Sequence, residues 1–285
     1  MKIGVSSYSF STYIKDTHCD YLKICDIAKE IGYDGIEFIN LDHADWGITD
    51  NPLKTAAEIR EHCKSIGLEI IAYTVGANFL AADIDAEMAR LRACVDVAAE
   101  LGAPLMRHDV CYRLPADPFY SYREAIRDMK DNISALSDYA ASKGIRTCTE
   151  NHGYIFQAPE RVEELIRAVG NPNYGWLCDM GNFLCADCEP AGSVSIAARY
   201  AIHVHAKDFI FKSAMTPRPN GFFGTTGGNH LRGTVLGHGV VPVGQCIDIL
   251  KAAGYDGYVS LEFEGWEDNI RAIKEGYNHL CSVCK

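Results

Sequence analysis

The chain lacks any apolar run as long as the roughly 18–20 residues that a membrane-spanning helix requires. Its first ten residues, MKIGVSSYSF, enter a strand-like pattern at once and lack the apolar core of a secretory signal peptide. Lys and Arg together number 27 against 38 Asp and Glu, giving a formal net charge of −11 and a pI near 5.3. An acidic chain without clustered cations argues against nucleic acids and anionic membranes as partners. We therefore expect a cytoplasmic protein without a nucleic-acid or membrane partner.

Two nucleotide-binding motifs are also missing. No GxGxxG follows the first strand-like run, and no GxxxxGK[ST] occurs anywhere in the chain. A doubly wound α/β sheet, the alternative to the fold proposed below, therefore has no motif in its favour. No Gly-rich helix start with a nearby Lys marks a phosphate cradle either.

Cysteine is plentiful, with 12 residues, yet the pattern does not predict disulfides. Most lie in apolar runs, where a reduced Cys acts as a small hydrophobic side chain. A chain of 285 residues with 48% hydrophobic content does not need covalent crosslinks to fold. Two CxxC pairs, Cys185–Cys188 and Cys281–Cys284, lie too far apart in sequence for one zinc ribbon. We interpret both pairs as structural or incidental.

Strand-like and helix-like segments alternate along the whole chain. The predicted strands are residues 3–7, 35–38, 69–74, 105–108, 146–150, 175–179, 201–205 and 257–262. Helical patterns lie at 21–31, 56–66, 86–101, 122–143, 159–169, 191–198, 243–253 and 267–283, and several end at a glycine. Eight βα units in a chain of this length predict an α/β fold, a (β/α)8 TIM barrel that forms a single domain over residues 1–285.

One long segment, residues 208–241, follows the seventh predicted strand. It contains Pro217, Pro219 and seven glycines between positions 221 and 239. We expect a structureless loop on the C-terminal face of the barrel, where active sites form, and a role as a lid or binding loop.

Four strands end on a residue that can bind a metal ion. The runs are GIRTCTE with Glu150, YGWLCD with Asp179, AIHVH with His205 and YVSLE with Glu262. Because the ends of parallel barrel strands converge on one rim, we expect these side chains to meet. His203 shares a strand face with His205, and Glu264 shares one with Glu262, so the pattern alone leaves either member of each pair as the ligand.

The ligand set narrows the choice of metal. Three carboxylates and one imidazole suit Mn²⁺, Mg²⁺, Co²⁺ or Fe²⁺ better than a structural Zn²⁺, which favours thiolates and imidazoles. We expect one divalent ion, with Mn²⁺ preferred and Zn²⁺ also allowed. Coordination positions left open would take substrate oxygens.

An ordered set of motifs resembles the sugar phosphate isomerase/epimerase family of xylose-isomerase-like barrels, over essentially the whole chain. The motifs are GYDGIEF at 32–38, ENHG at 150–153, CDMGN at 178–182, HVHAKD at 203–208, GHG at 237–239 and GYDGYVSLEFEG at 254–265. That family includes ketose 3-epimerases, inosose dehydratases and isomerases, and the large subunits of C-glycoside deglycosidases. Endonuclease IV is a distant relative.

The resemblance implies which residues hold the metal, selecting His205 over His203 and Glu262 over Glu264. The implied ligands are Glu150, Asp179, His205 and Glu262. It also implies that Glu150 and Glu262 remove and return a proton at a carbon beside a carbonyl, through a metal-stabilised enediolate. The implied function is a divalent-metal-dependent isomerase or epimerase acting on a sugar, keto-sugar or cyclitol.

Further residues are candidates beside these ligands. His152, two residues after Glu150, is a candidate catalytic acid or base, with a hydrogen-bonded loop histidine as the alternative; in deglycosidase-like members such a histidine would assist departure of an aglycone. The candidate substrate contacts are His108, which ends the fourth strand, Glu37, Lys207, and Arg232 and His238 from the long segment. Lys207 could instead pair with a barrel carboxylate.

The chain departs from the pattern at Asn182, where ketose 3-epimerases and endonuclease IV typically carry His. This departure argues against an endonuclease and against a simple ketohexose epimerase. Two alternatives stay open: a lyase that performs β-elimination, as a dehydratase or keto-glycoside-cleaving enzyme, and a non-catalytic sugar-binding subunit. The expected partner is a small carbohydrate or cyclitol, and the resemblance also allows a homo-oligomer or a small partner subunit.

Overall fold

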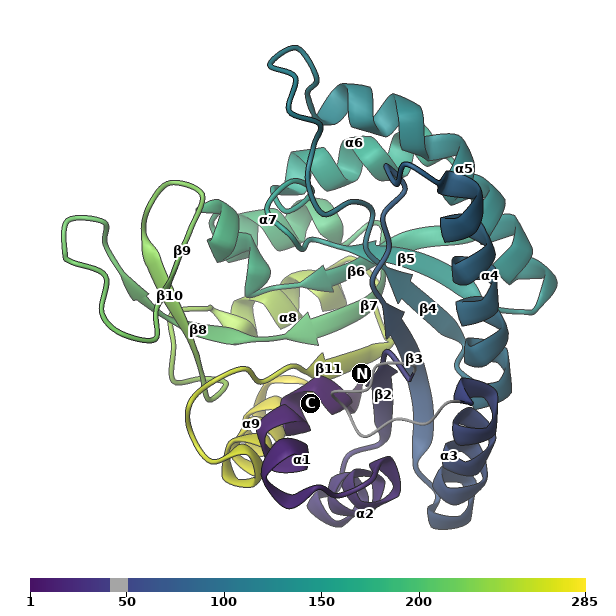
Figure 1. The fold of residues 1–285 in the computed structure, drawn as a ribbon. Helices are drawn as coiled ribbons and strands as arrows, with labels where there is room; N and C mark the ends of the chain where they lie inside the picture. The colour runs from purple at the N-terminus through teal and green to yellow at the C-terminus, as the bar shows by residue number, and fades with distance from the viewer. Residues whose placement is uncertain (42–50) are drawn as a thin grey trace.

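The computed structural model describes residues 1–41 and 51–285. Eight parallel strands close into a barrel in the order β1-β11-β7-β6-β5-β4-β3-β2, with helices outside (Figure 1). The strands are Lys2–Ser6 (β1), Gly35–Ile39 (β2), Glu69–Val75 (β3), Leu105–His108 (β4), Arg146–Glu150 (β5), Tyr174–Asp179 (β6), Ala201–Ala206 (β7) and Tyr258–Leu261 (β11). The predicted (β/α)8 barrel is confirmed, and each predicted strand end falls within about one residue of the observed one.

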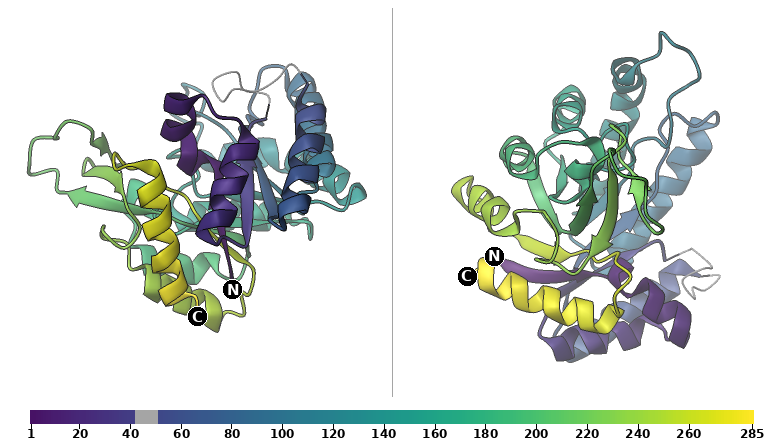
Figure 2. Two further views of the ribbon diagram at one scale, coloured as in Figure 1. Left: turned by 90° about the horizontal axis from the view of Figure 1, so that it is seen from below. Right: turned by 90° about the vertical axis from the view of Figure 1, so that its left-hand side faces the viewer.

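Helices surround the barrel, and the two ends of the chain lie close together (Figure 2). The helices are Ser11–Thr17 (α1), Tyr21–Ile31 (α2), Pro52–Ile66 (α3), Ile84–Leu101 (α4), Tyr122–Ser142 (α5), Pro159–Val169 (α6), Pro190–Ala197 (α7), Val243–Ala252 (α8) and Asn269–Val283 (α9). The described residues also contain the 3₁₀ turns Ser7–Phe10 (η1) and Asn182–Ala186 (η3). Within the described ranges, none of the helices combines the length and apolar character that crossing a membrane demands.

Local sequence explains where the helices begin and end. Ser121 and Glu124 form a reciprocal capping box at the start of α5, which satisfies backbone N–H groups that have no partner within the helix. Gly32 ends α2 with φ of 116°, a conformation that a side chain would strain. All twelve cysteines are free thiols, most of them buried.

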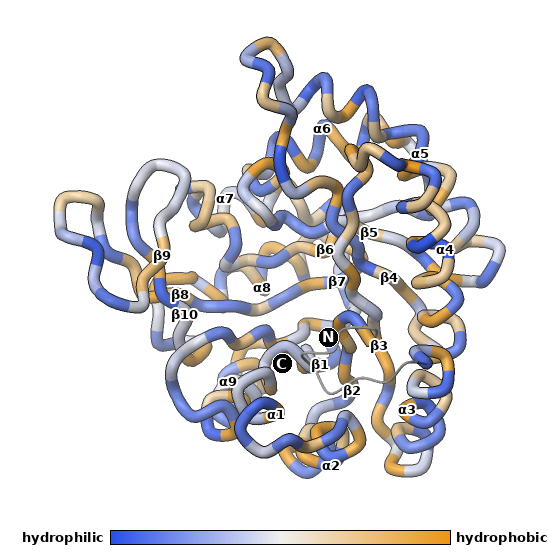
Figure 3. Tube along the Cα trace, viewed as in Figure 1, coloured by the Kyte–Doolittle hydropathy of each residue, from blue (hydrophilic) through white to orange (hydrophobic). Residues whose placement is uncertain are grey.

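Apolar side chains fill the space between barrel and helices, and orange segments follow the strands in Figure 3. Inside the barrel, a smaller apolar cluster contains Ala72, Leu105, Cys148 and Leu177. Polar and charged side chains continue the inward-facing rows beyond this cluster, since Cys148 and Glu150 lie two residues apart on β5. The barrel interior is therefore apolar toward the N-terminal ends of the strands and charged at their C-terminal ends.

Residues 208–241 are not the structureless loop that we expected. Asp208–Lys212 (β8), Phe223–Gly224 (β9) and His230–Thr234 (β10) form an antiparallel sheet in the order β8-β10-β9 that projects from the barrel (Figure 1). Phe209 and Leu231 are fully buried on one of its faces, which provides the sheet with its own small core. The glycines and prolines that suggested a loop fall mainly between these short strands.

Asp208 attaches the end of this segment to the barrel. Its carboxylate accepts hydrogen bonds from the backbone N–H groups of Phe209, Gly237, Gly239 and Val241, at 2.8–3.0 Å. Four donors on one buried carboxylate hold the returning chain close to the start of β8.

Candidate metal centre and substrate pocket

The four residues predicted as metal ligands meet at the C-terminal end of the barrel. Each of Glu150, Asp179, His205 and Glu262 offers a ligand atom, and these atoms all lie within 4.8 Å of one another. Strand register explains the convergence, because Asp179 pairs with His205 across β6 and β7, while Ser260 pairs with His205 across β7 and β11.

The imidazole of His205 faces the three carboxylates through Nδ1. This atom lies 3.6 Å from Glu262 Oε2, 3.8 Å from Glu150 Oε1 and 4.0 Å from Asp179 Oδ2. Within residues 1–41 and 51–285, neither His205 Nδ1 nor Asp179 Oδ2 has a hydrogen-bond partner, although both are buried. Ligand atoms around a divalent ion with bonds of about 2.1 Å lie roughly 3–4 Å apart. The donor set and its spacing therefore fit a divalent cation.

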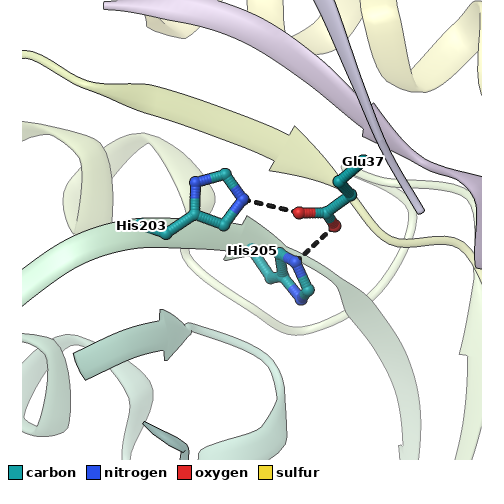
Figure 4. Close-up of side chains that lie close together, drawn as sticks. All are labelled: Glu37, His203 and His205. Carbon is teal, nitrogen blue, oxygen red and sulfur yellow. Dashed lines mark hydrogen bonds and ion pairs between the residues drawn. The ribbon is translucent and has the colours of Figure 1, made fainter. Parts of the chain in front are cut away.

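A second group of buried residues sets the orientation of His205. The Glu37 carboxylate lies between two imidazoles, with Oε1 at 2.6 Å from His205 Nε2 and Oε2 at 2.7 Å from His203 Nε2 (Figure 4). An ion pair with a carboxylate favours the proton on Nε2 and leaves Nδ1 facing the three carboxylates. Burial raises the pKa of Glu37, but the charges of His205 and His203 lower it well below its usual range. Glu37 is fully buried and does not line the pocket. The structure therefore does not bring Glu37 to the place where the expected substrate contact would form.

Among the three carboxyl groups of the centre, Asp179 has a raised pKa, whereas the pKa values of Glu150 and Glu262 are lowered. Asp179 Oδ1 accepts backbone N–H groups of Gly181 and Asn182 at 2.8 and 2.9 Å. Burial, together with the charges of Glu150 and Glu262, raises its pKa to about 7, although Lys207 opposes the shift. A buried acidic cluster of this kind is stabilised by an added cation.

Arg107 is the main residue that the sequence analysis missed. Its Nη2 lies 2.8 Å from Glu150 Oε2 and 2.8 Å from Asp109 Oδ1, and Asp109 Oδ1 lies 3.1 Å from His152 Nδ1. Burial lowers the pKa of His152, but the hydrogen bond to Asp109 outweighs it, so the net shift is upward. Burial would raise the pKa of Asp109, yet Arg107 and His152 bring it down to about 2.

Strand alternation accounts for Arg107 and for the different position of His108. Arg107 pairs with Thr74 on β3 and Cys148 on β5, so it belongs to the inward-facing row. His108 faces the other side, where it is fully buried and its ring stacks on Tyr174 at 5.7 Å. The structure therefore does not bring His108 to the pocket as the expected substrate contact.

Lys207 and Asn182 also contact the carboxylates of the site. Lys207 Nζ lies 2.5 Å from Glu262 Oε2, 3.3 Å from Glu264 Oε2 and 3.5 Å from Asp179 Oδ2. Asn182, the position that departs from the family pattern, donates through Nδ2 to Glu150 Oε1 at 2.9 Å and lies 3.3 Å from Lys207. The side-chain amide of Asn182 therefore contacts both Glu150 and Lys207.

A cavity of about 210 Å³ opens above these residues. Its charged lining residues are Arg107, Asp109, Glu150, His152, Lys207, Glu262 and Glu264. Tyr8, Ile39 and Val75 also line it and offer aromatic and aliphatic surface. His152 is half exposed, so its imidazole is within reach of a bound molecule.

Arg232 and His238 do not reach this cavity, contrary to expectation. The Arg232 guanidinium lies over the rings of Trp266 and Phe222, at 5.3 and 5.5 Å from their centroids. His238 lines a separate cavity with Arg271. The reason is the course of β8 and β10, which carry this segment to the side of the barrel (Figure 1).

Comparison with known proteins gives a family match over most of the chain. The model of the xylose isomerase-like TIM barrel family matches residues 25–283. A curated relative, the uncharacterised protein MJ1311 of Methanocaldococcus jannaschii, is 26% identical over 154 residues, which are 50% of this chain and 46% of that protein. The matched stretch thus spans about half the length of this relative.

Solved structures of the same architecture cover nearly the whole chain. The zinc-bound IolI protein has a TM-score of 0.77 at 18% identity, covering 100% of this chain and 98% of its own. The probable 3-DHS dehydratase AsbF of Bacillus anthracis has a TM-score of 0.74 at 18% identity, covering 99% of both chains. An L-ribulose 3-epimerase has a TM-score of 0.73 at 17% identity, covering 99% of this chain and 94% of its own. Identities this low show a shared fold and no more.

Proposed function

The chain belongs to the xylose isomerase-like TIM-barrel family, and from that premise we propose that it is a divalent-metal-dependent isomerase or epimerase of a small sugar, keto-sugar or cyclitol. The observation that carries the proposal is the meeting of Glu150, Asp179, His205 and Glu262 beside a small open cavity. The fold it shares with an L-ribulose 3-epimerase and with zinc-bound IolI is compatible with this reading.

Glu150, Asp179, His205 and Glu262 would hold the cation, for which we propose Mn²⁺. When bound, the cation would supply positive charge beside the substrate's carbonyl oxygen and so make the neighbouring C–H more acidic. Glu37 keeps His205 Nδ1 directed toward the cation.

Glu150 and Glu262 are the proposed pair for proton transfer. Burial raises the pKa of each, but Arg107 outweighs it at Glu150, while Lys207 and His205 outweigh it at Glu262, so both pKa values end below the usual range. Both carboxylates are therefore ionised at neutral pH and able to accept a proton from carbon. One would remove the proton beside the carbonyl, and the other would return a proton to the opposite face.

A lyase is the second candidate, and the contact between His152 and Asp109 favours it. Asp109 holds the His152 imidazole at the pocket wall and raises its pKa. A protonated imidazole in this position can donate a proton to a hydroxyl or aglycone oxygen as the C–O bond breaks. The first proton transfer would be shared with the epimerase reaction, and only the presence of a leaving group one carbon further on would differ.

A screen of keto-sugars and inososes in D₂O with Mn²⁺, read by mass spectrometry, tests both candidates. Deuterium entry without loss of water supports epimerisation or isomerisation, whereas loss of water or an aglycone supports the lyase. Glu150→Gln and Glu262→Gln should abolish either signal. Deuterium exchange that persists in each of the two single variants, or no exchange with any compound, would refute the proposed proton-transfer pair.

A further inference from the structure

The charged lining of the pocket carries more acidic than basic side chains. Its carboxylates are Asp109, Glu150, Glu262 and Glu264, and its permanent cations among the described residues are Arg107 and Lys207. Counting His152 as a third cation still leaves the carboxylates in excess. An anionic substrate would therefore enter a pocket whose own charge opposes it.

Both cations are already balanced by carboxylates. Arg107 Nη2 lies 2.8 Å from Glu150 and 2.8 Å from Asp109, while Lys207 lies 2.5 Å from Glu262 and 3.3 Å from Glu264. Their side chains are only 6% and 5% exposed. Phosphate sites depend on Arg or Lys whose charge is available to the anion, and neither cation here meets that requirement.

The same balance holds with a divalent ion in the predicted centre. The ion adds two positive charges, and Asp179 beneath the pocket adds one carboxylate. Among the lining residues, Asp179 and the ion, positive and negative charges are then equal if His152 is protonated, and negative charge is in excess by one if it is neutral; Glu37 behind His205 adds a further carboxylate. In neither state does the site need charge from the substrate.

The uncharged residues that line the cavity, and its volume, also argue against an anionic substrate. Tyr8, Ile39 and Val75 offer surface suited to the C–H face of a ring. The cavity, at about 210 Å³, is smaller than the roughly 300–1,000 Å³ of sites for drug-sized ligands. Resting on the proposed function, we propose that the substrate is an uncharged, monosaccharide-sized polyhydroxy ketone, such as a free ketose or a cyclitol ketone. The pocket discriminates against analogues that carry a phosphate or carboxylate, since an anion would lose its water beside unneutralised carboxylates.

Matched pairs of free and phosphorylated ketoses test this inference. The full chain loaded with Mn²⁺ is incubated in D₂O with D-fructose or D-fructose 6-phosphate, and with D-xylulose or D-xylulose 5-phosphate. The kcat/KM for deuterium entry is read by mass spectrometry. In any pair that exchanges, the free sugar should exceed its phosphate ester at least about tenfold. Equal or faster exchange of the ester would overturn the inference and leave the proposed function intact.

A charge variant links the preference to these residues. Glu264→Gln removes a carboxylate from Lys207 and should raise the ester-to-free-sugar ratio of kcat/KM at least about threefold. Glu160→Gln, an exposed position on α6, serves as the matched control and should leave the ratio unchanged. A ratio that does not move in Glu264→Gln contradicts the charge argument.

If neither ketose pair exchanges, binding decides the inference, and the wider screen of keto-sugars and inososes decides the proposed function separately. Thermal shifts of the Mn²⁺-loaded protein would be compared for D-fructose, myo-inositol and inorganic phosphate. Stabilisation by a neutral polyol but not by phosphate supports an uncharged ligand. Stabilisation by phosphate that disappears in Arg107→Gln, or the absence of any shift with the neutral compounds, overturns it.

Discussion

Glu37→Gln tests whether the buried carboxylate of β2 prepares His205 for a metal ion. The carboxylate contacts His205 Nε2 at 2.6 Å and His203 Nε2 at 2.7 Å and is fully buried. The amide keeps the shape but has only one acceptor oxygen, so one of the two imidazole N–H groups meets an NH₂ group.

The expected size of the effect follows from these contacts. Glu37 forms a hydrogen bond with His203 Nε2 and an ion pair with His205 Nε2. A hydrogen bond to a charged group contributes about 1.5–3 kcal/mol, so the loss of either contact should lower the free energy of unfolding by no more than a similar amount. Disturbing a partner that orients a ligand typically costs about 10–100-fold in metal affinity. We therefore expect Mn²⁺ to bind roughly 10–100-fold more weakly to Glu37→Gln, and the protein to remain folded at 25 °C.

Calorimetric titration with Mn²⁺ measures the affinity, and circular dichroism during urea unfolding measures the stability. Glu69→Gln is the matched control, because Glu69 begins β3 at the opposite end of the barrel and is half exposed beside Lys2. An unchanged Mn²⁺ affinity in a folded Glu37→Gln protein would refute the proposed orienting role.

Three further predictions concern pH, the carboxylate pair and the additional sheet. Mn²⁺ has to displace the proton of Asp179, whose pKa is raised to about 7, so calorimetric affinity should rise with pH below pH 7, by up to about tenfold per pH unit for this one proton. A flat profile from pH 5.5 to 7 would contradict this. Arg107 lowers the pKa of Glu150, so Arg107→Gln should move the acidic limb of the deuterium-exchange profile to higher pH, while the exposed Arg113→Gln should not move it. Leu231→Ala should lower the free energy of unfolding by about 2–5 kcal/mol in urea titrations, because this β10 side chain is fully buried in the small core of the additional sheet. Val240→Ala, at a half-exposed position, should change the free energy of unfolding little.

The barrel was predictable because each strand is a short apolar run bounded by helical periodicity and glycine. The same pattern placed Glu150, Asp179, His205 and Glu262 at strand ends, and strand ends in a closed parallel barrel meet. This reasoning requires only the approximate boundary of each strand. For that reason it held for residues taken from four strands far apart in sequence.

The orientation of single residues was harder to predict, because it depends on register. A shift of one position turns a side chain from the pocket to the outer core, which is why His108 was expected where Arg107 lies. Register shifts between Ile36 and Glu37 and between Trp176 and Leu177 arise from neighbouring strands and leave no mark on a single sequence.

The segment 208–241 posed a different difficulty. Its strands are only two to five residues long, and the glycines and prolines around them are equally typical of a loop. The sheet is defined by the pairing of β10 with β8 and β9, and Phe209 and Leu231 form its small core. The side to which this sheet turns then determines that Arg232 and His238 lie away from the cavity.

The contacts of the Glu37 carboxylate with His203 and His205 make the candidate metal centre depend on the folding of the whole chain. Glu37 lies on β2 and His203 on β7, 166 residues later. A nascent chain that ends before His203, or a fragment holding only the first four strands, contains only one side of this contact. Contacts so distant in sequence form late, after the large entropic cost of closing the intervening chain has been met. Tight binding of the proposed cation would therefore require the complete barrel and would separate finished molecules from partly folded ones.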